Sequence, residues 1–493
     1  MTKSRTRPRR QPLDRLAQAL MVFLAIIMVG MILFGGPAAS KVRNFTWQNQ
    51  QVGAMDTAFL LTFSRPMDQT SVEQNLTIEP PLPGRFSWAG RRMAYTLNFP
   101  APYGNEFQVS LPIAKDRFSG DSANFVPFEA SFKSRERAFT YIGIEGEERG
   151  RLVLYNLSDQ SKVPLTPEGW TILDYKPYSR GDRILFSALE QGQNTQQDQR
   201  LYTVTTGLGE SSPDGSGQVE IVLDNQDYQN LKFDLSPDGQ TIVVQRVSRS
   251  NPGDFGPWVI TQDKEPRRLE TEPGGDFIIA PDSQSLLLQQ GQGTAIIALS
   301  DADDEQSGET LDFLPEYGLV MDVADNGSAA AMVSFNQDDP EKRFTQTLFW
   351  VSSQGDEKAL LNVTGAILDA QFDPTSQLLF CLTSELVEAE TYKVQPAISV
   401  INLNTEDVEE LRQLPPQPSG HMSLAPDGLA ILYDEVIPGA DNSAIVNDGV
   451  AIATSQLWLL PLYPTSEARI NKQPKAIEPK MLPFPGLNPL WIP

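Results

Sequence analysis

A short phrase recurs along most of this chain: a run of apolar residues, a turn of the Ser-Pro-Asp-Gly type, and a second apolar run. The clear copies are FDLSPDGQTIVV around Pro237, FIIAPDSQSLLL around Pro281, AQFDPTSQLLF around Pro374 and MSLAPDGLAILY around Pro426. Two degenerate copies lie around Arg180 and Ala324, so the six turns are 43 to 57 residues apart. A repeat of this period indicates that one structural unit is built several times over.

Each turn is of a kind that joins two strands. In LSPDGQ, Pro237 presets φ near about −65°, Asp238 tolerates the bridge region, and Gly239 takes the left-handed position that closes a hairpin. Further apolar phrases follow the turns at a spacing too short for crossover helices: RLYTVTT, PWVIT, TAIIAL, TLFWVSS, AISVINL and SQLWLLPL. Each unit is therefore expected to be a small antiparallel sheet, and several such sheets around an axis form a β-propeller.

The number of sheets depends on the segment before the first turn phrase. Residues 139–166 hold two apolar strands and a third, but no turn phrase precedes them, so this unit lacks its innermost strand. The C-terminal GLNPLWIP has the apolar character to supply it, by pairing of Leu490–Ile492 with Phe139–Ile144. We therefore predict a seven-bladed propeller over residues 138–493, closed by the two ends of that segment, with six blades as the alternative.

These repeats resemble the TolB-like and WD40-like propeller repeats. In those families a unit reads as an apolar strand, Ser-Pro-Asp-Gly, an apolar strand, and a strand of the L-W-x-h-x-L kind. The resemblance covers residues 138–493 and implies a platform for protein interaction, a binder of small ligands or, less often, an enzyme. It specifies the fold well and the function poorly.

The segment over residues 44–134 follows a different pattern, because its apolar residues alternate with period two. Alternation is clear at Phe59, Leu61 and Phe63, and again from Met93 to Phe99. It places these side chains on one face of each strand, which predicts a small antiparallel β-sandwich. The whole body is therefore expected to be all-β.

The same segment resembles the bacterial Ig-like domain of the S-layer type. The resemblance rests on LTFSRPMDQTSVEQNLTIEP, followed by GRFSWAGRRMAYTL and PYGNEFQVSL. It implies a surface-exposed spacer or interaction module without a cofactor or catalytic residues. Among the residues that match its F-S-x-P-M-D motif, Pro66 and Asp68 are expected to shape a turn, and Phe63 and Met67 to lie in the core.

The N-terminal segment joins a basic stretch to an apolar run. Residues 1–15 are basic, and LAQALMVFLAIIMVGMILF, residues 16–34, holds no charged residue. At about 1.5 Å per residue, this run nearly crosses a hydrocarbon core of about 30 Å. We predict a transmembrane anchor over residues 16–36, with a cytoplasmic tail over 1–15 and an extracytoplasmic body. A cleaved signal peptide ending near Ala38 or Ala39 is the alternative, and it leaves the body on the same side.

Charge is divided unevenly along the chain. Residues 1–50 carry eight basic residues against Asp14 alone, whereas the net charge of the whole chain is −24. The body is therefore strongly acidic and would be repelled by phosphate backbones, so we expect no nucleic-acid partner.

Residues with catalytic or metal-binding chemistry are few. The single histidine, His421, and the single cysteine, Cys381, leave no disulfide framework and none of the usual zinc or copper sites, and we interpret both residues as structural. The acidic stretches 301–309 and Asp338–Glu341 offer oxygen ligands for calcium, but we interpret them as solvated loops. No nucleophile elbow and no phosphate-binding loop is present. We therefore expect no catalytic, cofactor-binding or metal-binding residues.

The expected function is that of a membrane-anchored, extracytoplasmic binding protein without enzymatic activity. The Ig-like module is interpreted as a spacer, and the propeller as a platform that binds a protein or another envelope component at one face. The alternative is a propeller enzyme of the lactonase or lyase kind with a calcium ion in its central funnel. A third hypothesis is an adhesion protein that acts mainly through the Ig-like module.

Overall fold

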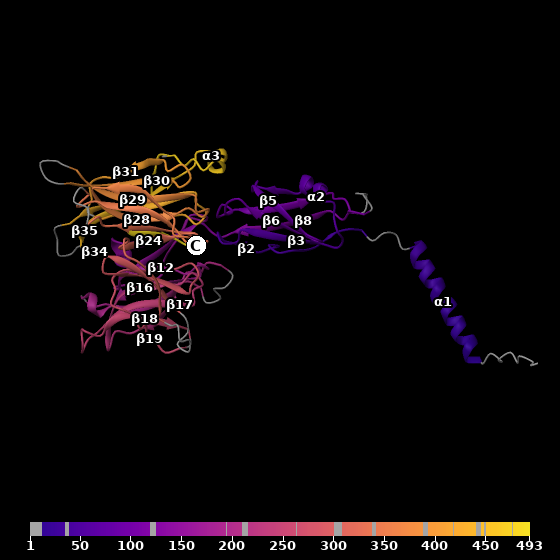
Figure 1. Ribbon diagram of the computed structural model, residues 1–493, viewed down its shortest axis with the longest axis horizontal. Helices are drawn as coiled ribbons and strands as arrows, with labels where there is room; N and C mark the ends of the chain where they lie inside the picture. The colour runs from indigo at the N-terminus through magenta and orange to yellow at the C-terminus, as the bar shows by residue number, and fades with distance from the viewer. Residues whose placement is uncertain are drawn as a thin grey trace, which may run out of the picture. The chain divides into compact units, whose positions relative to one another are not determined.

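A computed structural model describes residues 12–34, 39–118, 125–193, 195–209, 215–262, 264–299, 308–337, 342–387, 393–417, 419–439, 445–447, 450–475 and 477–493. Within this range the chain is all-β with few helices and forms two compact units (Figure 1). The first unit holds the described residues up to Asn49, together with Ala58–Thr96 and Phe107–Phe132. The second unit holds Gln50–Thr57, Leu97–Glu106 and Lys133–Pro493.

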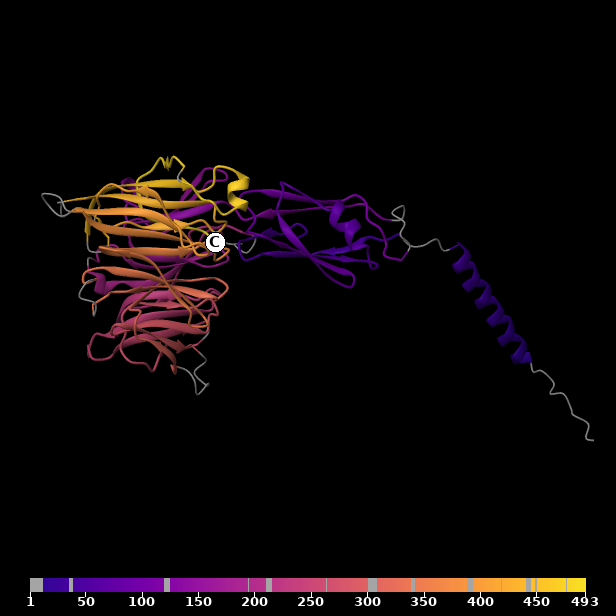
Figure 2. The same cartoon turned by 45° about the horizontal axis from the view of Figure 1, so that its top comes forward.

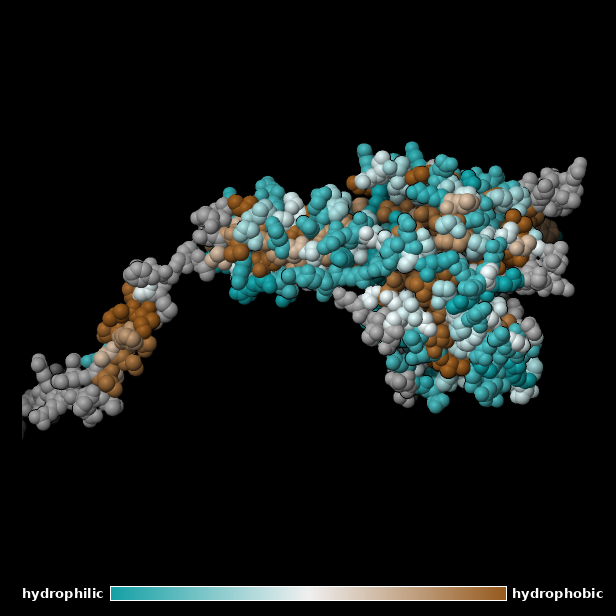
Figure 3. All heavy atoms as spheres, turned by 180° about the vertical axis from the view of Figure 1, so that it is seen from behind, coloured by the Kyte–Doolittle hydropathy of each residue, from teal (hydrophilic) through white to brown (hydrophobic). Residues whose placement is uncertain are grey.

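The first unit begins with helix α1, Pro12–Phe34. Its apolar side chains are exposed, with exposed fractions of 60% for Leu20, 64% for Met21 and 64% for Ile26 (Figure 3). In the part of the chain that the structure describes, no helix reaches both the length and the hydropathy needed to span a membrane. The anchor predicted over residues 16–36 is thus not supported.

Two four-stranded sheets follow, and they pack around an aromatic core. One sheet has the order β1 (Val42–Phe45), β3 (Ala58–Phe63), β6 (Arg92–Leu97) and β5 (Gly84–Ala89). The other has the order β2 (Gln51–Val52), β8 (Phe128–Ser134), β7 (Glu106–Leu111) and β4 (Thr77–Glu79). Of these strands, β2 falls within the second unit. Phe45 contacts Phe59 edge to face at 5.2 Å, and Phe107 stacks on Phe132 at 5.1 Å between ring centroids. The alternating residues therefore lie in one core, as their period predicts.

The residues of the F-S-x-P-M-D motif have separate roles. Phe63 and Met67 are buried, as predicted. Asp68 was expected to shape a turn, but it caps a short helix, α2 (Gln69–Asn75), because its carboxylate accepts the Ser71 amide at 2.8 Å. An aspartate at this position satisfies one of the free amides at a helix start.

The second unit contains seven antiparallel sheets within the described residues, and these lie side by side (Figure 1, Figure 2). The first sheet has the strand order β37 (Gly486–Trp491), β9 (Ala138–Gly143), β10 (Leu152–Asn156) and β11 (Ser161–Pro164), and the second has the order β12 (Thr171–Pro177), β13 (Arg183–Leu189), β14 (Arg200–Thr205) and β15 (Val219–Leu223). The third sheet has the order β16 (Tyr228–Leu235), β17 (Thr241–Ser248), β18 (Phe255–Thr261) and β19 (Arg267–Arg268). The fourth has the order β20 (Phe277–Ile279), β21 (Ser285–Gln290), β22 (Gly293–Ala298) and β23 (Thr310–Leu314).

The fifth sheet has the strand order β24 (Leu319–Val323), β25 (Ala329–Ser334), β26 (Gln346–Ser352) and β27 (Glu357–Val363). The sixth has the order β28 (Gly365–Phe372), β29 (Leu378–Val387), β30 (Lys393–Asn402) and β31 (Val408–Gln413). The seventh contains β32 (Met422–Leu424), β33 (Ala430–Pro438) and β35 (Val450–Pro461), and strand β35 also pairs with β34 (Ile445–Asn447) and β36 (Lys480–Met481). Short helical turns lie at η1 (Gly146–Glu148), η2 (Gln196–Asp198) and α3 (Ser466–Ile470). A succession of small antiparallel sheets of this kind is the architecture of a β-propeller.

The C-terminal strand closes the unit. β37 pairs antiparallel with β9, with Leu490 opposite Thr140 and Trp491 opposite Phe139. The predicted pairing of the C-terminal segment with the strand at 139 is therefore confirmed. Trp491 is buried and contacts the Phe139 ring edge to face at 5.9 Å between ring centroids. The first sheet is thus built from both ends of the segment 138–493.

The turn phrases join the first strand of a sheet to the second. Gly239 has φ of 72° and Gly428 has φ of 70°, which is the left-handed region expected of these glycines. Asp238 accepts the amide of Gln240 at 2.9 Å, and Asp427 accepts the amide of Leu429 at 3.1 Å. These bonds stabilise the turns, so the recurring aspartate has a structural function.

We predict that removing the Trp491 side chain destabilises the propeller unit. Trp491→Ala deletes a buried aromatic contact at the closing pair, so the free energy of unfolding should fall by about 3–5 kcal/mol. Met481→Ala is the control, because Met481 is 61% exposed and its loss should change stability by less than about 0.5 kcal/mol. Urea unfolding followed by circular dichroism measures both. Equal effects of the two substitutions would show that the closing pair adds no stability.

Candidate functional site

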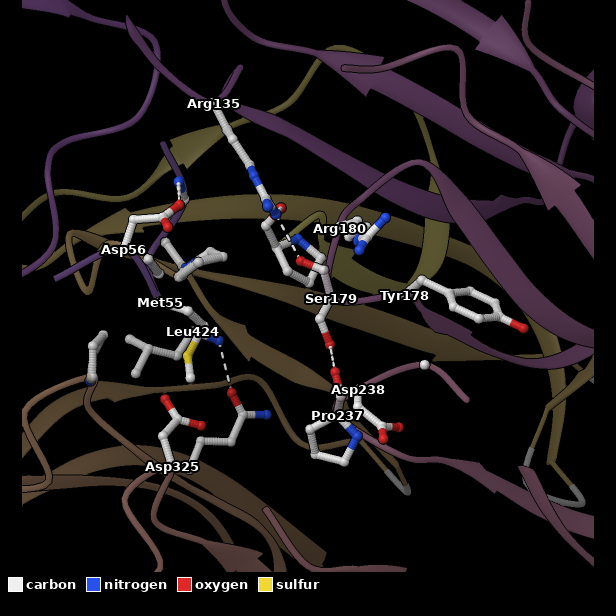
Figure 4. A pocket seen from close by; sticks show the side chains of 18 of the residues that line it. Met55, Asp56, Arg135, Tyr178, Ser179, Arg180, Pro237, Asp238, Asp325 and Leu424 are labelled. Atoms are coloured by element: carbon white, nitrogen blue, oxygen red, sulfur yellow. Dashed lines mark hydrogen bonds between the residues drawn. The ribbon is translucent and has the colours of Figure 1, made fainter. Parts of the chain in front are cut away.

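A pocket of about 960 Å³ opens where the turn phrases of several sheets meet (Figure 4). All of its lining residues belong to the second unit. Turn residues Pro237, Pro374 and Pro426 contribute to the wall, together with the ends of strands β24, β28 and β32. The turn phrases therefore form the rim of this pocket, although their own aspartates stabilise the turns.

One side of the pocket is acidic. Asp322 on β24, Asp369 on β28 and Asp325 in the turn after β24 all line it. Within the described chain, none of the three forms an ion pair with a lysine or arginine. Among the described residues, this part of the wall thus carries three carboxylates without a lysine or arginine in an ion pair with them.

The protein around these carboxylates raises their pKa. Burial raises the pKa of Asp322 to about 7, and the neighbouring Asp369 and Asp325 carboxylates add to the rise. Burial likewise raises the pKa of Asp369 to about 6. The pKa of Asp325 is also raised, first by desolvation and then by the Asp373 carboxylate, although its side chain is exposed at the rim. Charging these groups is costly in the absence of a cation.

Two of the pocket side chains also join neighbouring sheets. The Asp322 carboxylate accepts the Phe372 amide at 2.8 Å, so β24 is tied to β28. The Gln371 side chain accepts the Leu424 amide at 2.8 Å and donates to the Met422 carbonyl at 3.1 Å, which ties β28 to β32. These residues lie on the first strand of each sheet, which pairs on only one edge.

The same kind of bond occurs at other junctions between sheets. Asp234 on β16 accepts the Ile279 amide of β20 at 2.7 Å and also pairs with Lys176 of β12. Asp434 on β33 accepts the Asn488 amide of β37 at 2.9 Å. Side chains of the first strands, or of the strand beside them, therefore bond to the backbone of the next sheet around the unit.

Three arginines, Arg135, Arg180 and Arg183, also line the pocket, together with three further aspartates. Arg180 is exposed at the rim. Arg135 donates to the Ser179 carbonyl at 2.6 Å and to the Pro493 carbonyl at 2.8 Å, so it joins the turn after β12 to the end of β37. The guanidinium of Arg183 lies 4.6 Å from the centre of the Tyr178 ring. Arg183 also lies 3.9 Å from the Asp182 carboxylate, so this part of the lining carries charges of both signs.

The two residues singled out from the sequence do not line this pocket, although each interacts electrostatically with the pocket residue Asp369. His421 lies at the start of β32, where its amide donates to Asp434 at 2.8 Å and its Nδ1 lies 3.4 Å from the same carboxylate. Cys381 is buried in β29, and burial raises the pKa of its thiol.

The calcium hypothesis concerned loops that the structure covers only in part. Residues 301–307 and 338–341 lie outside the described residues. Among the residues that are described, no group of three or more histidine, cysteine, aspartate or glutamate side chains is arranged to hold a metal ion.

Sequence reasoning missed the carboxylates of the pocket. A signal was present, because strands expected to be apolar carry polar residues at alternate positions before the turn. These are Asp174 and Lys176, Lys232 and Asp234, Asp322, Asp369 and Gln371, and His421 and Ser423. Period-two polarity on a first strand identifies the face that points away from the core.

Comparisons with known proteins add little to the description of the fold. No protein-family model matches the chain, and no curated protein matches it. Solved structures with similarity include TolB from Acinetobacter baumannii (11% identity, TM-score 0.40, 85% of this chain and 83% of that chain) and a putative 6-phosphogluconolactonase from Bacteroides uniformis (11%, 0.42, 73% and 99%). An oligogalacturonate lyase from Vibrio parahaemolyticus is also similar (11%, 0.41, 67% and 92%). Similarity at these scores carries no argument about this chain, so its description as a β-propeller rests on its own sheets.

We predict that Asp322 makes stability depend on pH. Its pKa is about 7 in the folded protein against an ordinary 3.8. At a pH between these two values, the folded protein therefore holds a proton that the unfolded chain has lost. The stabilising contribution of that proton is complete below about pH 4 and disappears as the pH rises through 7. The Asp322→Asn variant has no carboxylate to charge at this position, so it lacks this pH dependence. The Tm of the variant minus the Tm of the wild type should therefore increase by a few degrees as the pH is raised from about 5 to about 8.

The control for this experiment is Asp312→Asn, because Asp312 is an exposed residue of β23. The difference in Tm between this control and the wild type should not change with pH. A difference for Asp322→Asn that is equally constant would contradict the assigned pKa. Scanning calorimetry of the three proteins over the pH range provides the measurement.

Proposed function

We propose that this chain is a non-enzymatic, extracytoplasmic binding protein whose propeller binds a protein partner at the face with the turn-lined pocket. The observation that carries this proposal is the pocket itself, with its three carboxylates that have no cationic partner within the described chain. The Ig-like module, in this proposal, is a spacer. In this proposal the propeller has seven blades, one for each sheet, and β37 completes the first of them.

The form of the pocket supports binding. Its volume lies in the range of about 300–1,000 Å³ that is usual for ligand sites. It is built from turns and strand ends that a rigid set of sheets holds in place, and loops of this kind commonly carry binding residues. Apolar groups, among them Leu424, Met321 and Phe372, lie beside the charged ones.

The electrostatics indicate what kind of partner fits. A lysine or arginine side chain placed beside Asp322, Asp325 and Asp369 would favour their charged forms and offset the cost of their desolvation. Perturbed carboxylates in a cleft are typical of functional sites. We therefore propose a partner segment with a cationic side chain next to an apolar one.

The alternative is an enzyme of the lactonase or lyase kind with calcium in the central funnel. It requires several oxygen ligands that converge on one point. Within the described residues, the acidic side of the pocket provides carboxylates, but no group of three or more that could hold a metal ion. The binding function needs no such convergence.

We predict that charge on the acidic side of the pocket is required for partner capture. An N-terminally tagged full chain is cross-linked in its own cells and purified. Asp325→Asn combined with Asp369→Asn removes two pocket charges, and we expect recovery of the partner to fall at least about tenfold, which corresponds to about 1.4 kcal/mol.

The control removes the same charge elsewhere. Asp312→Asn combined with Asp407→Asn changes two exposed aspartates that do not line the pocket. This pair should recover the partner as well as the wild type does. If the pocket pair and the control pair recover equal amounts, the partner does not bind at the acidic side.

The proposed location rests on the N-terminal sequence. The uncharged run over residues 16–34 follows a basic segment, which is the arrangement of a membrane anchor or of a signal peptide. Either one would place the body outside the cytoplasm. Protease added to spheroplasts should therefore digest the body, and full protection until the cells are lysed would refute this location.

A further inference from the structure

One end of the β-sandwich in the first unit gathers basic side chains. Residues distant in sequence meet there, because the Ser64 amide donates to the Lys41 carbonyl at 2.8 Å and the Arg117 amide donates to the Pro66 carbonyl at 3.1 Å. The segments at this end are residues 40–41, 63–68, 90–92, 113–118 and 125–126. Their basic residues, which we call the basic end, are Lys41, Arg65, Arg91, Arg92, Lys115 and Arg117.

Few carboxylates offset this charge. The acidic residues of the same segments are Asp68 and Asp116. Asp68 caps helix α2, and Asp116 is only 5% exposed and lies 3.9 Å from the Arg65 guanidinium. Apart from Arg65, the side chains of the basic end are all exposed. In a chain whose net charge is −24, this end therefore presents a surface of the opposite sign.

Exposed apolar side chains lie among these cations. Phe118 is 80% exposed, Val126 46% and Ile113 43%. The Phe118 amide donates to the Asp116 carboxylate at 2.8 Å, and the Val126 amide donates to the Ser40 carbonyl at 2.9 Å, so the fold holds both backbones in place. Aromatic and aliphatic side chains beside lysine and arginine are the combination with which proteins bind anionic lipid surfaces.

The chain itself brings the basic end close to helix α1. The helix ends at Phe34, and Ser40, which forms a β-bridge with Phe125, is six residues further along. Six residues of extended chain reach at most about 20 Å. The basic end is therefore within about 20 Å of the end of a helix whose apolar side chains are exposed, whatever the direction of that helix.

We propose that the basic end docks on an anionic membrane surface, with the Phe118 ring inserted among the lipid headgroups. The proposal goes beyond the binding function of the propeller, because it concerns another surface, and it uses the proposed location only to place the body beside a membrane. Each lysine or arginine near such a surface strengthens binding roughly fivefold. Acidic groups elsewhere on the body oppose this weakly, since charges are screened over about 8 Å at physiological ionic strength.

A fluorescent label beside Phe118 tests the docking in the full chain. The chain is incorporated into lipid nanodiscs made of phosphatidylcholine, either alone or mixed with phosphatidylglycerol. Val126→Cys carries a nitrobenzoxadiazole label, and Cys381 does not compete for it because burial raises the pKa of its thiol. Spin-labelled lipid quenches a label that touches the membrane. Leu60→Cys, 38% exposed in the middle of β3, is the control position.

We expect the label on Val126→Cys to be quenched in the anionic discs and much less in the neutral ones, and the label on Leu60→Cys in neither. Lys115→Gln combined with Arg117→Gln should lower the ratio of docked to undocked chain at least about tenfold. Phe118→Ala should lower it as well, because it removes the inserted ring. Ile113→Cys replaces Val126→Cys as the reporter if the latter lowers the Tm.

The matched control removes two exposed cations elsewhere. Arg85→Gln combined with Lys480→Gln changes β5 at the end away from the basic end, where Gly84 approaches the Thr96 carbonyl, and β36 of the second unit. This pair should dock as the wild type does. Equal quenching in the two kinds of disc, or equal losses from the two double variants, overturns the proposal.

The experiment separates this docking from the proposed anchor. Copurification of the chain with neutral discs reports insertion of α1, whereas the label reports the basic end. If the chain leaves the neutral discs, retention by anionic discs that is lost on Lys115→Gln with Arg117→Gln still supports the docking, and retention by neither overturns it. Capture of a partner by the propeller is measured independently and does not depend on either result.

Discussion

The rest of this structure depends on one constraint, which is that the first strand of each propeller sheet pairs with another strand on one edge only. A strand that pairs on one edge only leaves backbone amides without sheet partners, and buried amides need an acceptor. Here Asp234, Asp322, Gln371 and Asp434 accept amides from the neighbouring sheet at 2.7 to 2.9 Å. Successive sheets are thereby joined by side-chain bonds as well as by packing. Three of these four side chains are carboxylates, so they also bring ionisable groups to the junctions between sheets.

This arrangement explains why a pocket that contains carboxylates with raised pKa values lies at the face formed by the turn phrases. Asp322 both joins β24 to β28 and lines the pocket, so its position is fixed by the fold. Its environment raises its pKa to about 7, and the Asp369 carboxylate, whose own pKa is raised, contributes to that rise. A carboxylate that the fold already holds in place loses little freedom when a cationic partner binds, which supports the proposed binding function.

The sequence predicts the sheets better than the site, because the signals for strands and turns are local in the sequence and the signals for the site are not. Turn chemistry at Gly239 and apolar character at Trp491 are local, and they led to the hairpins and to the closing pair. The acidic side of the pocket joins residues from two sheets, which no local pattern reveals. Polar residues at alternate positions, such as Asp369 and Gln371, were the available signal. Nothing in the sequence around Met55 indicated that its turn lines a pocket of the propeller unit.

In the proposed function, the face of the propeller that holds the turn-lined pocket contacts the partner. Photo-cross-linking in cells tests it most directly, with benzoyl-phenylalanine placed at Gln240 on the pocket rim or at Leu311, which is 55% exposed on the outer strand β23. We predict a covalent adduct with a partner protein from Gln240 and none from Leu311. An adduct from Leu311 with none from Gln240 would contradict the account.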